Sequence, residues 1–442
     1  MRRVKEWSEA YAPRLREEGG VRYRYDGVPL VRVERTYRLL TPLFGGGVEP
    51  RLADPVTVVR GTEVRGQLRF WWRAVRGWQA EGDLKRLFDL EAAIFGSAGE
   101  GGASPVAVEV EVLEPGADEF PYVVTEVYNK QKQRREKKVK PRNEVAHSYL
   151  TFPLRPEGKQ PIPIPLRTGV RFRLTVTFPT TVRTANGHLD LHKELEAALW
   201  AWETFGGIGA RTRRGFGALT LEGSKVPTEA EIRERLRRYS RDSGWPDGVP
   251  HLTPQSLFRV VNLSWRKVAE EYQAFRQART QGRGSEWPEP KAIRHLYGYR
   301  KAEKGSLPSH TGPKSPGSVL IRFPRGQFGL PIVFQFRGGN PLPTTILRPV
   351  DGDRLASPLI FRPLDAKVCL LAVLEGPRMP PKGVLLVKKK ENGEEEVLAP
   401  EQGEPPLEVC LSAKEAAGIA VLNGKEDPLR AFVEYLPGGE EE

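Results

Sequence analysis

Residues 65–77 read RGQLRFWWRAVRG, and the spacing of apolar side chains in and just before this stretch predicts an α-helix. The apolar positions recur at spacings of four, three and four residues, which is the period of a single helix face. They are Val64, Leu68, Trp71 and Val75. We therefore expect a helix that packs this face against a core and keeps its other side chains outside that core.

The segments around this helix complete a recognisable order of elements. Alternation of β-branched or aromatic with polar residues predicts strands, and a 3.6-residue apolar period predicts helices. The expected strands are 31–43, 104–113, 170–179 and 218–223, and further helices are expected at 83–96 and 188–205. The resulting unit contains strand, helix, strand, strand, helix and strand, which is the ferredoxin-like arrangement of many RNA-binding modules.

The second half shows a similar mixture of patterns after a Gly/Pro-rich connector. Strands are predicted at 257–263, 318–324, 330–336, 358–364, 368–375 and 383–389, helices at 265–279 and 427–436, and a polar loop at 301–318. The fold class predicted is α+β, with two tandem ferredoxin-like (RRM-like, βαββαβ) domains that carry loop and hairpin insertions. The expected domains are 1–223, with a basic insertion at about 114–169, then a linker at 224–256, and 257–442 with an acidic tail.

The charge distribution points to a polyanionic partner. The chain of 442 residues has a formal net charge of +13. From residue 391 onward there are 14 acidic and 3 basic residues, a net of −11, so residues 1–390 carry +13 − (−11) = +24. A field of this sign attracts nucleic acid or an acidic membrane face. The alternative is that the charge only keeps a heat-adapted protein in solution.

Composition also limits the chemistry that we expect. The two cysteines, Cys369 and Cys410, are too few for a disulfide framework or a zinc cluster, so we expect neither a metal nor a cofactor. No stretch approaches the roughly 18 apolar residues of a membrane span, and the N-terminus has no signal-peptide core. We expect a soluble cytoplasmic protein without a membrane partner.

A basic stripe lies beside the apolar face of the first helix. Its arginines follow at spacings of four, four and three, with a tryptophan next to them, and such a surface can bind phosphates and stack on a base. These residues are Arg65, Arg69, Arg73, Arg76 and Trp72. The alternative is a solvated face whose arginines pair with carboxylates. Because Glu63 is the one acidic residue between positions 55 and 78, we favour the RNA-binding interpretation.

Two glycine-rich stretches could bring backbone amides close to an anion. FGGIGARTRRGFG, residues 205–217, contains Arg211, Arg213 and Arg214 and matches neither a dinucleotide fingerprint nor a Walker loop. Its alternative is a helix cap followed by a glycine turn. FGGG at 44–47 gives Gly45 and Gly46 as further candidates, or is only a tight turn.

The insertion holds the densest basic run, KQKQRREKKVKPR at 130–142, with eight basic residues and one acidic residue. It lies between strand-like residues 122–128 and 147–152. Such runs are often solvated tips, yet they also order on a phosphate backbone. The candidate RNA contacts are Lys132, Arg134, Arg135, Lys137 and Lys138.

Catalytic constellations are scarce. The six histidines begin at His147, and His188 with His192 is a weak candidate metal pair without an H-E-x-x-H pattern. The sequence therefore predicts binding without catalysis.

Several blocks together resemble the RAMP proteins of CRISPR systems, and most closely the first-numbered Cmr subunit of type III-B effector complexes. They are LLTPLFGGG (39–47), RGTEVRGQLRFWWRAVRG (60–77), GGIGARTRRGFGAL (206–219), GLPIVFQF (329–336) and RLASPLIFRPL (354–364). The resemblance implies two ferredoxin-like domains and membership of an RNA-silencing ribonucleoprotein. The expected partners are guide RNA, target RNA near the guide 3′ end, and other Cmr or RAMP subunits.

Two other functions stay open at this point. One is a metal-independent endoribonuclease that processes guide RNA, which shares the fold. The other is a purely structural scaffold whose arginine stripe docks acidic partner subunits.

Overall fold

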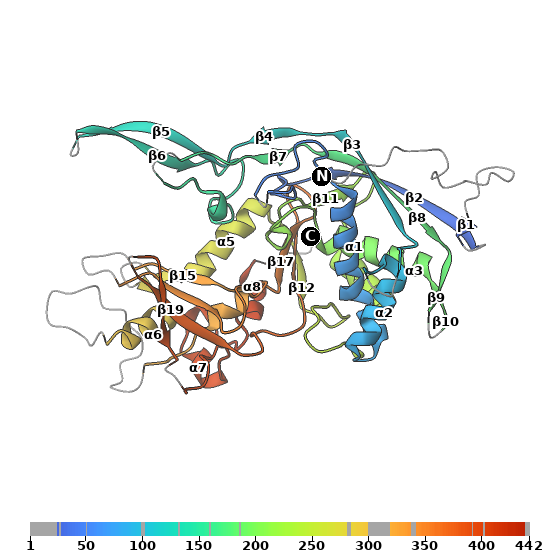
Figure 1. Cartoon of the computed structure of the whole chain (residues 1–442). Coiled ribbons are helices and arrows are strands. Elements are labelled where there is room, and N and C mark those ends of the chain that lie inside the picture. Colours follow the sequence, from blue (N-terminus) through green and yellow to red (C-terminus); the bar gives the residue numbers. More distant parts are fainter. Residues whose placement is uncertain are drawn as a thin grey trace, which may run out of the picture.

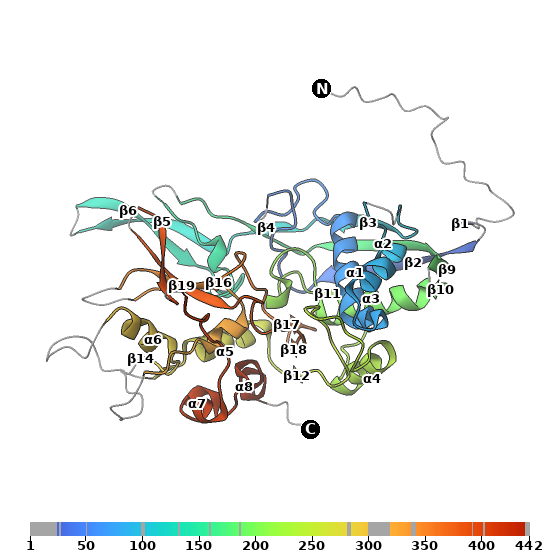
Figure 2. The same cartoon turned by 60° about the horizontal axis from the view of Figure 1, so that its bottom comes forward.

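The computed structural model describes residues 24–437, apart from 26–27, 50, 99–101, 131–132, 159–160, 185–186, 281–283, 299–318, 337–341, 391 and 401–402. The predicted loop at 301–318 and the candidate contact Lys132 lie outside the described residues. Within them the chain is a mixed α/β structure. One antiparallel sheet of more than two strands lies in the N-terminal half and two lie in the C-terminal half, besides four two-stranded ribbons (Figures 1 and 2).

The N-terminal half has the predicted order of elements. β8 lies between β3 and β2, and β11 pairs with the other edge of β2, all antiparallel. Counted along the chain, the four strands therefore stand in the order fourth, first, third, second. The strands are β1 (Arg24–Tyr25), β2 (Val28–Leu39), β3 (Ala107–Glu114), β8 (Arg171–Pro179) and β11 (Leu219–Leu221), and the helices are α1 (Gly61–Arg76), α2 (Leu84–Phe95) and α3 (Leu191–Phe205).

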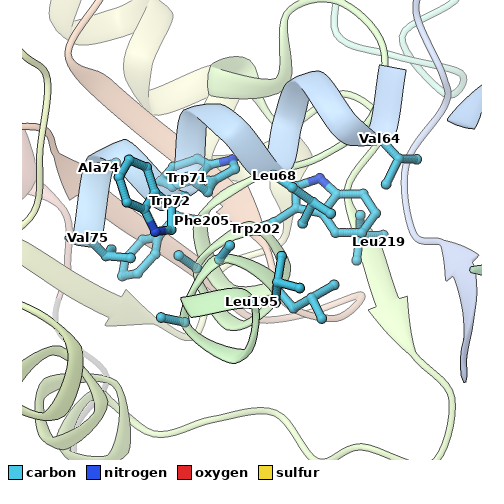
Figure 3. Packing of buried hydrophobic residues seen from close by; sticks show 14 of the residues in the cluster. Val64, Leu68, Trp71, Trp72, Ala74, Val75, Leu195, Trp202, Phe205 and Leu219 are labelled. Atoms are coloured by element: carbon cyan, nitrogen blue, oxygen red, sulfur yellow. The ribbon is translucent and has the colours of Figure 1, made fainter. Parts of the chain in front are cut away.

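Helices α1 and α3 cover one face of this sheet. The predicted apolar face of α1 is buried against α3 and β11, as Figure 3 shows for Val64, Leu68, Trp71 and Val75. In α3, Leu195, Trp202 and Phe205 complete the contact (Figure 3). From the sheet, Phe172, Leu174, Val176 and Phe178 on alternate positions of β8 are also buried. The helix period and the strand period that the sequence predicts are both confirmed.

The insertion between β3 and β8 is a pair of antiparallel ribbons. Figure 1 shows its outer hairpin, β5 with β6, reaching from the end of the first sheet over the C-terminal half. Residues 147–152, predicted as a strand, instead form a turn that leads into the 3₁₀ helix Phe152–Leu154. The ribbon strands are β4 (Ala117–Glu119), β5 (Tyr122–Asn129), β6 (Arg134–Pro141) and β7 (Leu166–Thr168); a separate hairpin consists of β9 (Thr181–Thr184) and β10 (Gly187–Asp190).

The C-terminal half begins with a similar order but its first sheet has three strands among the described residues. β18 lies between β12 and β17, so the order is first, third, second, and no described strand occupies the fourth position. This differs from the complete second βαββαβ unit that the sequence predicts. The elements are α4 (Glu229–Tyr239) in the connector, then β12 (Phe258–Val261), α5 (Trp265–Gln277), β17 (Leu359–Pro363), β18 (Cys369–Val373) and α8 (Pro428–Tyr435).

A second sheet in this half is built from segments inserted before β17 and after β18. Its order is β15–β16–β19–β20. The predicted strand at 318–324 is absent from the described residues 319–324, and Pro324 instead begins the 3₁₀ helix Pro324–Phe328. The remaining elements are β13 (Arg279–Thr280), β14 (Gly284–Ser285), α6 (Glu289–Leu296), β15 (Ile332–Phe334), β16 (Thr345–Pro349), β19 (Val384–Lys389), β20 (Glu395–Ala399) and α7 (Ala413–Ala417).

The two halves share one core. Phe258, Ile360 and Leu370 of the C-terminal half belong to the same buried cluster as α1 and α3. Arg362 of β17 is buried and donates hydrogen bonds to the carbonyl oxygens of Glu203 (2.6 Å) and Leu219 (2.5 Å) in the N-terminal half. We therefore treat the halves as one packed body.

Several acidic residues in the described part of the C-terminal region belong to helices and strands. Glu395 and Glu396 of β20 pair with Arg348 and Lys388, and Glu434 of α8 pairs with Lys425 at 2.6 Å. These three carboxylates thus pair with cations of the same half.

Candidate nucleic-acid interface

The C-terminal end of the α1 arginine stripe is buried, contrary to the prediction. Arg76 is 3% exposed and donates hydrogen bonds to both oxygens of Glu194 on α3, at 2.9 and 2.5 Å. Trp72 is 0% exposed, and its indole N–H donates to the same carboxylate at 2.8 Å. Arg76 cannot face RNA and Trp72 cannot stack on a base, so both assignments are wrong.

Two arginines in the middle of the stripe share one carboxylate of α2. The buried Glu91 accepts hydrogen bonds from Arg69 (2.5 Å) through one oxygen and from Arg73 (2.5 Å) through the other. Arg65 donates to the carbonyl oxygen of Phe95 at the end of α2. Arg65, Arg69 and Arg73 are partly exposed and have partners on α2, and their assignment to RNA stays a prediction.

The glycine-rich loop also directs two of its arginines inward. Arg213 donates to the carbonyl oxygen of Ser357 (2.5 Å), and its guanidinium lies over the Phe70 ring at 5.3 Å. Arg214 donates to the carbonyl oxygen of Leu359 (2.8 Å) and to the Tyr272 hydroxyl (3.2 Å). Both arginines join the two halves and are only partly exposed, and their assignment to RNA stays a prediction.

Arg211 differs from its neighbours. It has a left-handed backbone, with φ of 56°, and its side chain has no hydrogen bond or ion pair to any residue that the structure describes. Burial, together with the nearby charge of Arg214, lowers the pKa of Arg211 to about 10. It stays charged at neutral pH, and it is the one arginine of the loop that lacks a structural partner among the described residues.

The two glycine-rich stretches meet at the N-terminal end of α1. The amide of Ala210 donates to the carbonyl oxygen of Phe44 at 2.7 Å. Glu63 lies between the stretches and accepts a hydrogen bond from the Gly209 amide at 2.6 Å. A side chain at Gly46, whose φ is 97°, would approach this carboxylate to 3.0 Å. Gly45 is buried and Gly46 is partly exposed beside the Glu63 carboxylate, and their assignment to RNA stays a prediction.

Glu63 is an unusual group for this location. Burial raises its pKa to about 7, against the opposing effect of the Gly209 amide and Arg60. Its second carboxylate oxygen is buried without a hydrogen-bond partner. The carboxylate therefore holds the two loops together at a cost in desolvation.

The β5–β6 hairpin presents the exposed basic surface. Residues 122–141, without the two that the structure does not describe, hold six basic and two acidic residues, a net of +4. The exposed basic side chains are Lys130, Arg134, Arg135, Lys137, Lys138 and Lys140. Arg134 and Arg135 pair with Glu136 and Glu126 at 3.3 and 3.6 Å, and exposed pairs of this kind are weak.

The two faces of the hairpin differ. The cross-strand pairs Tyr128↔Arg135 and Glu126↔Lys137 lie on one face, and Asn129↔Arg134 and Thr125↔Lys138 lie on the other. Both faces thus carry cations, and Tyr128 near the tip is 57% exposed. Of the predicted contacts, Arg134, Arg135, Lys137 and Lys138 are placed where a phosphate backbone can reach them.

The helix-free face of the first sheet does not provide an alternative cationic surface. Arg171 pairs with Glu222 at 2.6 Å, and Arg173 pairs with Glu111 at 2.9 Å. Arg32 pairs with Glu34 on the same face. These ion pairs balance the charge on this face, so the positive electrostatic potential around the protein must come from other elements.

A second cationic cluster was not predicted. Arg276 of α5 and Arg325 of the 3₁₀ helix Pro324–Phe328 each donate to the other's carbonyl oxygen, at 2.9 and 3.0 Å. Tyr272, one turn before Arg276, packs edge-on against Tyr149 from the root of the hairpin insertion, with ring centroids 5.9 Å apart. The one sequence signal for this cluster was the four-residue spacing of Tyr272 and Arg276 on α5. The same spacing occurs on any amphipathic helix face, so it could not identify the cluster.

No group of three or more metal-binding side chains occurs among the described residues. No described helix has the length and apolar character needed to cross a bilayer.

Comparison with known proteins agrees with the resemblance seen in the sequence. Residues 36–220 match the family model described as the RAMP superfamily. The chain is 24% identical over 200 residues to the CRISPR system Cmr subunit Cmr1-2 of Pyrococcus furiosus, a match that covers 41% of this chain and 91% of that protein. It is 27% identical over 179 residues to Cmr1-1 of the same organism, covering 40% of this chain and 44% of that protein.

Two solved structures are also similar. One is Cmr1 from Pyrococcus furiosus in its apo form, with 15% identity, a TM-score of 0.43, and coverage of 83% of this chain and 94% of that chain. The other is a chain of the type III-B Cmr-beta complex bound to cognate target RNA, with 15% identity, a TM-score of 0.43, and coverage of 78% and 94%.

Proposed function

We propose that this chain, a CRISPR RAMP protein of the Cmr type, is a non-catalytic RNA-binding subunit of a type III-B effector complex. Its proposed partners are the guide RNA, target RNA near the guide 3′ end, and other Cmr subunits. We also propose that the two halves are diverged ferredoxin-like units, since β12–β18–β17 repeats the first, third, second order of β2–β8–β3.

The observation that carries this proposal is the β5–β6 hairpin. Its exposed lysines and arginines outnumber its two glutamates by four in the described part, and the hairpin extends away from the first sheet (Figure 1). A basic ribbon of this kind binds a phosphate backbone without reading sequence. Guide and target strands vary in sequence, so contacts that depend on backbone charge suit such ligands.

The structure changes which residues we assign to RNA. The α1 arginines have carboxylate or carbonyl partners inside the fold, and so do not need RNA to satisfy them. The hairpin cations are exposed, with the exposed Glu126 and the partly buried Glu136 beside them. We therefore assign RNA binding to Arg134, Arg135, Lys137 and Lys138.

The test is the salt dependence of single-stranded RNA binding. A variant with alanine at positions 134, 135, 137 and 138 removes four cations, and the log–log slope against salt is expected to fall by about 3 units. The control removes four exposed cations from elsewhere, at Lys225, Arg237, Lys367 and Lys414. Equal slopes for the hairpin variant and the wild-type protein would exclude the hairpin as the RNA contact.

The non-catalytic part of the proposal has its own test. Incubation with repeat-containing RNA in EDTA should leave the RNA intact. Cleavage that disappears on replacing a histidine such as His147 would instead establish the metal-independent endoribonuclease.

A further inference from the structure

Four arginines and two tyrosines from separate segments meet where the halves join. Arg211 and Arg214 come from the glycine-rich loop, Arg276 and Tyr272 from α5, Arg325 from the 3₁₀ helix after it, and Tyr149 from the hairpin root. Arg214 donates to the Tyr272 hydroxyl at 3.2 Å. The Tyr149 side chain interacts with Arg276 and Arg325 and lies near Arg211.

The positive charge of this cluster is not balanced within the described residues. Glu289 is its one carboxylate; it is 0% exposed and pairs with Arg325 at 3.2 Å. Four guanidiniums against one carboxylate leave a net of 4 − 1 = +3. Burying like charges together is unfavourable unless an opposite charge is present. The cluster therefore lacks the negative charge that would balance its arginines.

Donors in the cluster are also left without acceptors. The Nε atom of Arg211 is buried and has no hydrogen-bond partner, and the same holds for the Nη2 atom of Arg325. Burial lowers the pKa of Arg325, which shows the same cost of desolvation as for Arg211. Buried N–H groups of charged side chains are normally hydrogen-bonded, so an acceptor is missing here.

We propose that this arginine–tyrosine cluster is a phosphate-binding site, with the partly exposed Arg211 and Arg276 among its ligands. A phosphate group supplies several acceptor oxygens and one to two negative charges, which suits converging guanidinium forks and tyrosine hydroxyls. Arg211 and Arg276 are partly exposed, so an anion can reach them from solvent. Arg325, held by Glu289 and by the carbonyl of Arg276, forms the floor.

The phosphate has two possible sources with the same chemistry. One is the backbone of the bound RNA, an assignment that rests on the proposed function. The other is a free phosphate or nucleotide. In either case the anion bridges the glycine-rich loop, the hairpin root and α5, and so fixes the hairpin relative to the C-terminal half.

Titration calorimetry of the full chain with inorganic phosphate tests the site. At constant ionic strength in chloride, the wild-type protein should bind phosphate, and Arg211→Gln should weaken binding by about tenfold or more, since a charge-assisted hydrogen bond is lost. Glutamine, like arginine, is a long polar residue, so the substitution should leave the left-handed backbone at position 211 as it is. Arg211 also has no hydrogen-bond partner among the described residues that the substitution would remove. Arg276→Gln should act in the same direction.

Arg237→Gln on the exposed face of α4 is the matched control and should change phosphate affinity less than twofold. Undetectable phosphate binding by the wild-type protein, or equal affinity of wild type and Arg211→Gln, would overturn the site.

The hairpin variant separates this inference from the proposed function. It should keep its phosphate affinity while losing RNA affinity, because its substitutions lie outside the cluster. If Arg211→Gln then weakens RNA binding as well, the phosphate belongs to the RNA backbone. If it weakens phosphate binding alone, the site stands and its ligand is a free phosphate or nucleotide, which overturns the RNA assignment.

Discussion

Replacing Glu194 by leucine is the sharpest perturbation of the α1–α3 contact. This carboxylate is 2% exposed and accepts hydrogen bonds from Arg76 at 2.5 and 2.9 Å and from the Trp72 indole at 2.8 Å. Glu194→Leu leaves the guanidinium of Arg76 charged and buried, with one remaining acceptor, the carbonyl oxygen of Tyr239. Breaking a buried pair in this way costs about 3–5 kcal/mol of unfolding free energy.

The double variant Arg76→Met/Glu194→Leu removes both charges and should recover most of that loss, since a buried pair replaced by apolar side chains is often neutral. Equilibrium urea unfolding followed by tryptophan fluorescence measures both variants. A loss below about 1 kcal/mol for Glu194→Leu, or no recovery in the double variant, would refute the claim that Arg76 serves the core.

Two further variants test the loops that join the halves. Glu63 has a folded pKa of about 7 against 4.5 for the ordinary group, so its stabilising effect is complete below about pH 4.5 and is lost as pH rises through 7. Glu63→Gln should therefore unfold at higher urea than wild type at pH 8, by up to about 3 kcal/mol, with the difference vanishing near pH 4.5; a constant difference across this range would contradict the assignment. Arg214→Met should lower the unfolding free energy by about 2–3 kcal/mol, because hydrogen bonds to Leu359 and Tyr272 are lost, whereas Arg237→Met should change it by less than about 0.5 kcal/mol. A similar cost for both arginine variants would mean that Arg214 does not join the halves.

The periodicity of the sequence was sufficient to predict most elements of the first sheet and its helices. Val64, Leu68 and Trp71 recur at the helix spacing because each must reach the same core, and alternate residues of β8 do so at the strand spacing. Such patterns are visible in the sequence because each turn of a helix, and each second residue of a strand, must place an apolar side chain in the core.

The roles of the α1 arginines could not be predicted from local sequence. Glu91 and Glu194 lie 22 and 118 residues from Arg69 and Arg76, and only the packing of α2 and α3 brings them to α1. The same holds for Arg213 and Arg214, whose acceptors are backbone carbonyls of the C-terminal half. Counting the acidic residues near an arginine in the sequence reveals neither distant carboxylates nor backbone carbonyl partners.

The basic insertion gave the opposite outcome. Its composition marked it as an exposed cationic segment, which is confirmed, but nothing in RREKKVKP alternates strongly enough to show that it is a strand. β6 exists because it pairs along its whole length with β5, whose valines and tyrosines have strand propensity. The strand predicted at 318–324 is the opposite error, because no strand occurs at the described residues 319–324. Pro324 cannot donate a ladder hydrogen bond and begins a 3₁₀ helix.

The central claim is that the hairpin, and not the α1 arginine stripe, contacts RNA. Ultraviolet crosslinking of the assembled effector with its RNA, read by mass spectrometry of the peptides, tests it most directly. We predict nucleotide adducts on residues 128–140, around Tyr128, and none on α1. Adducts on the α1 segment from Arg65 to Arg76 with an unmodified hairpin would contradict the account.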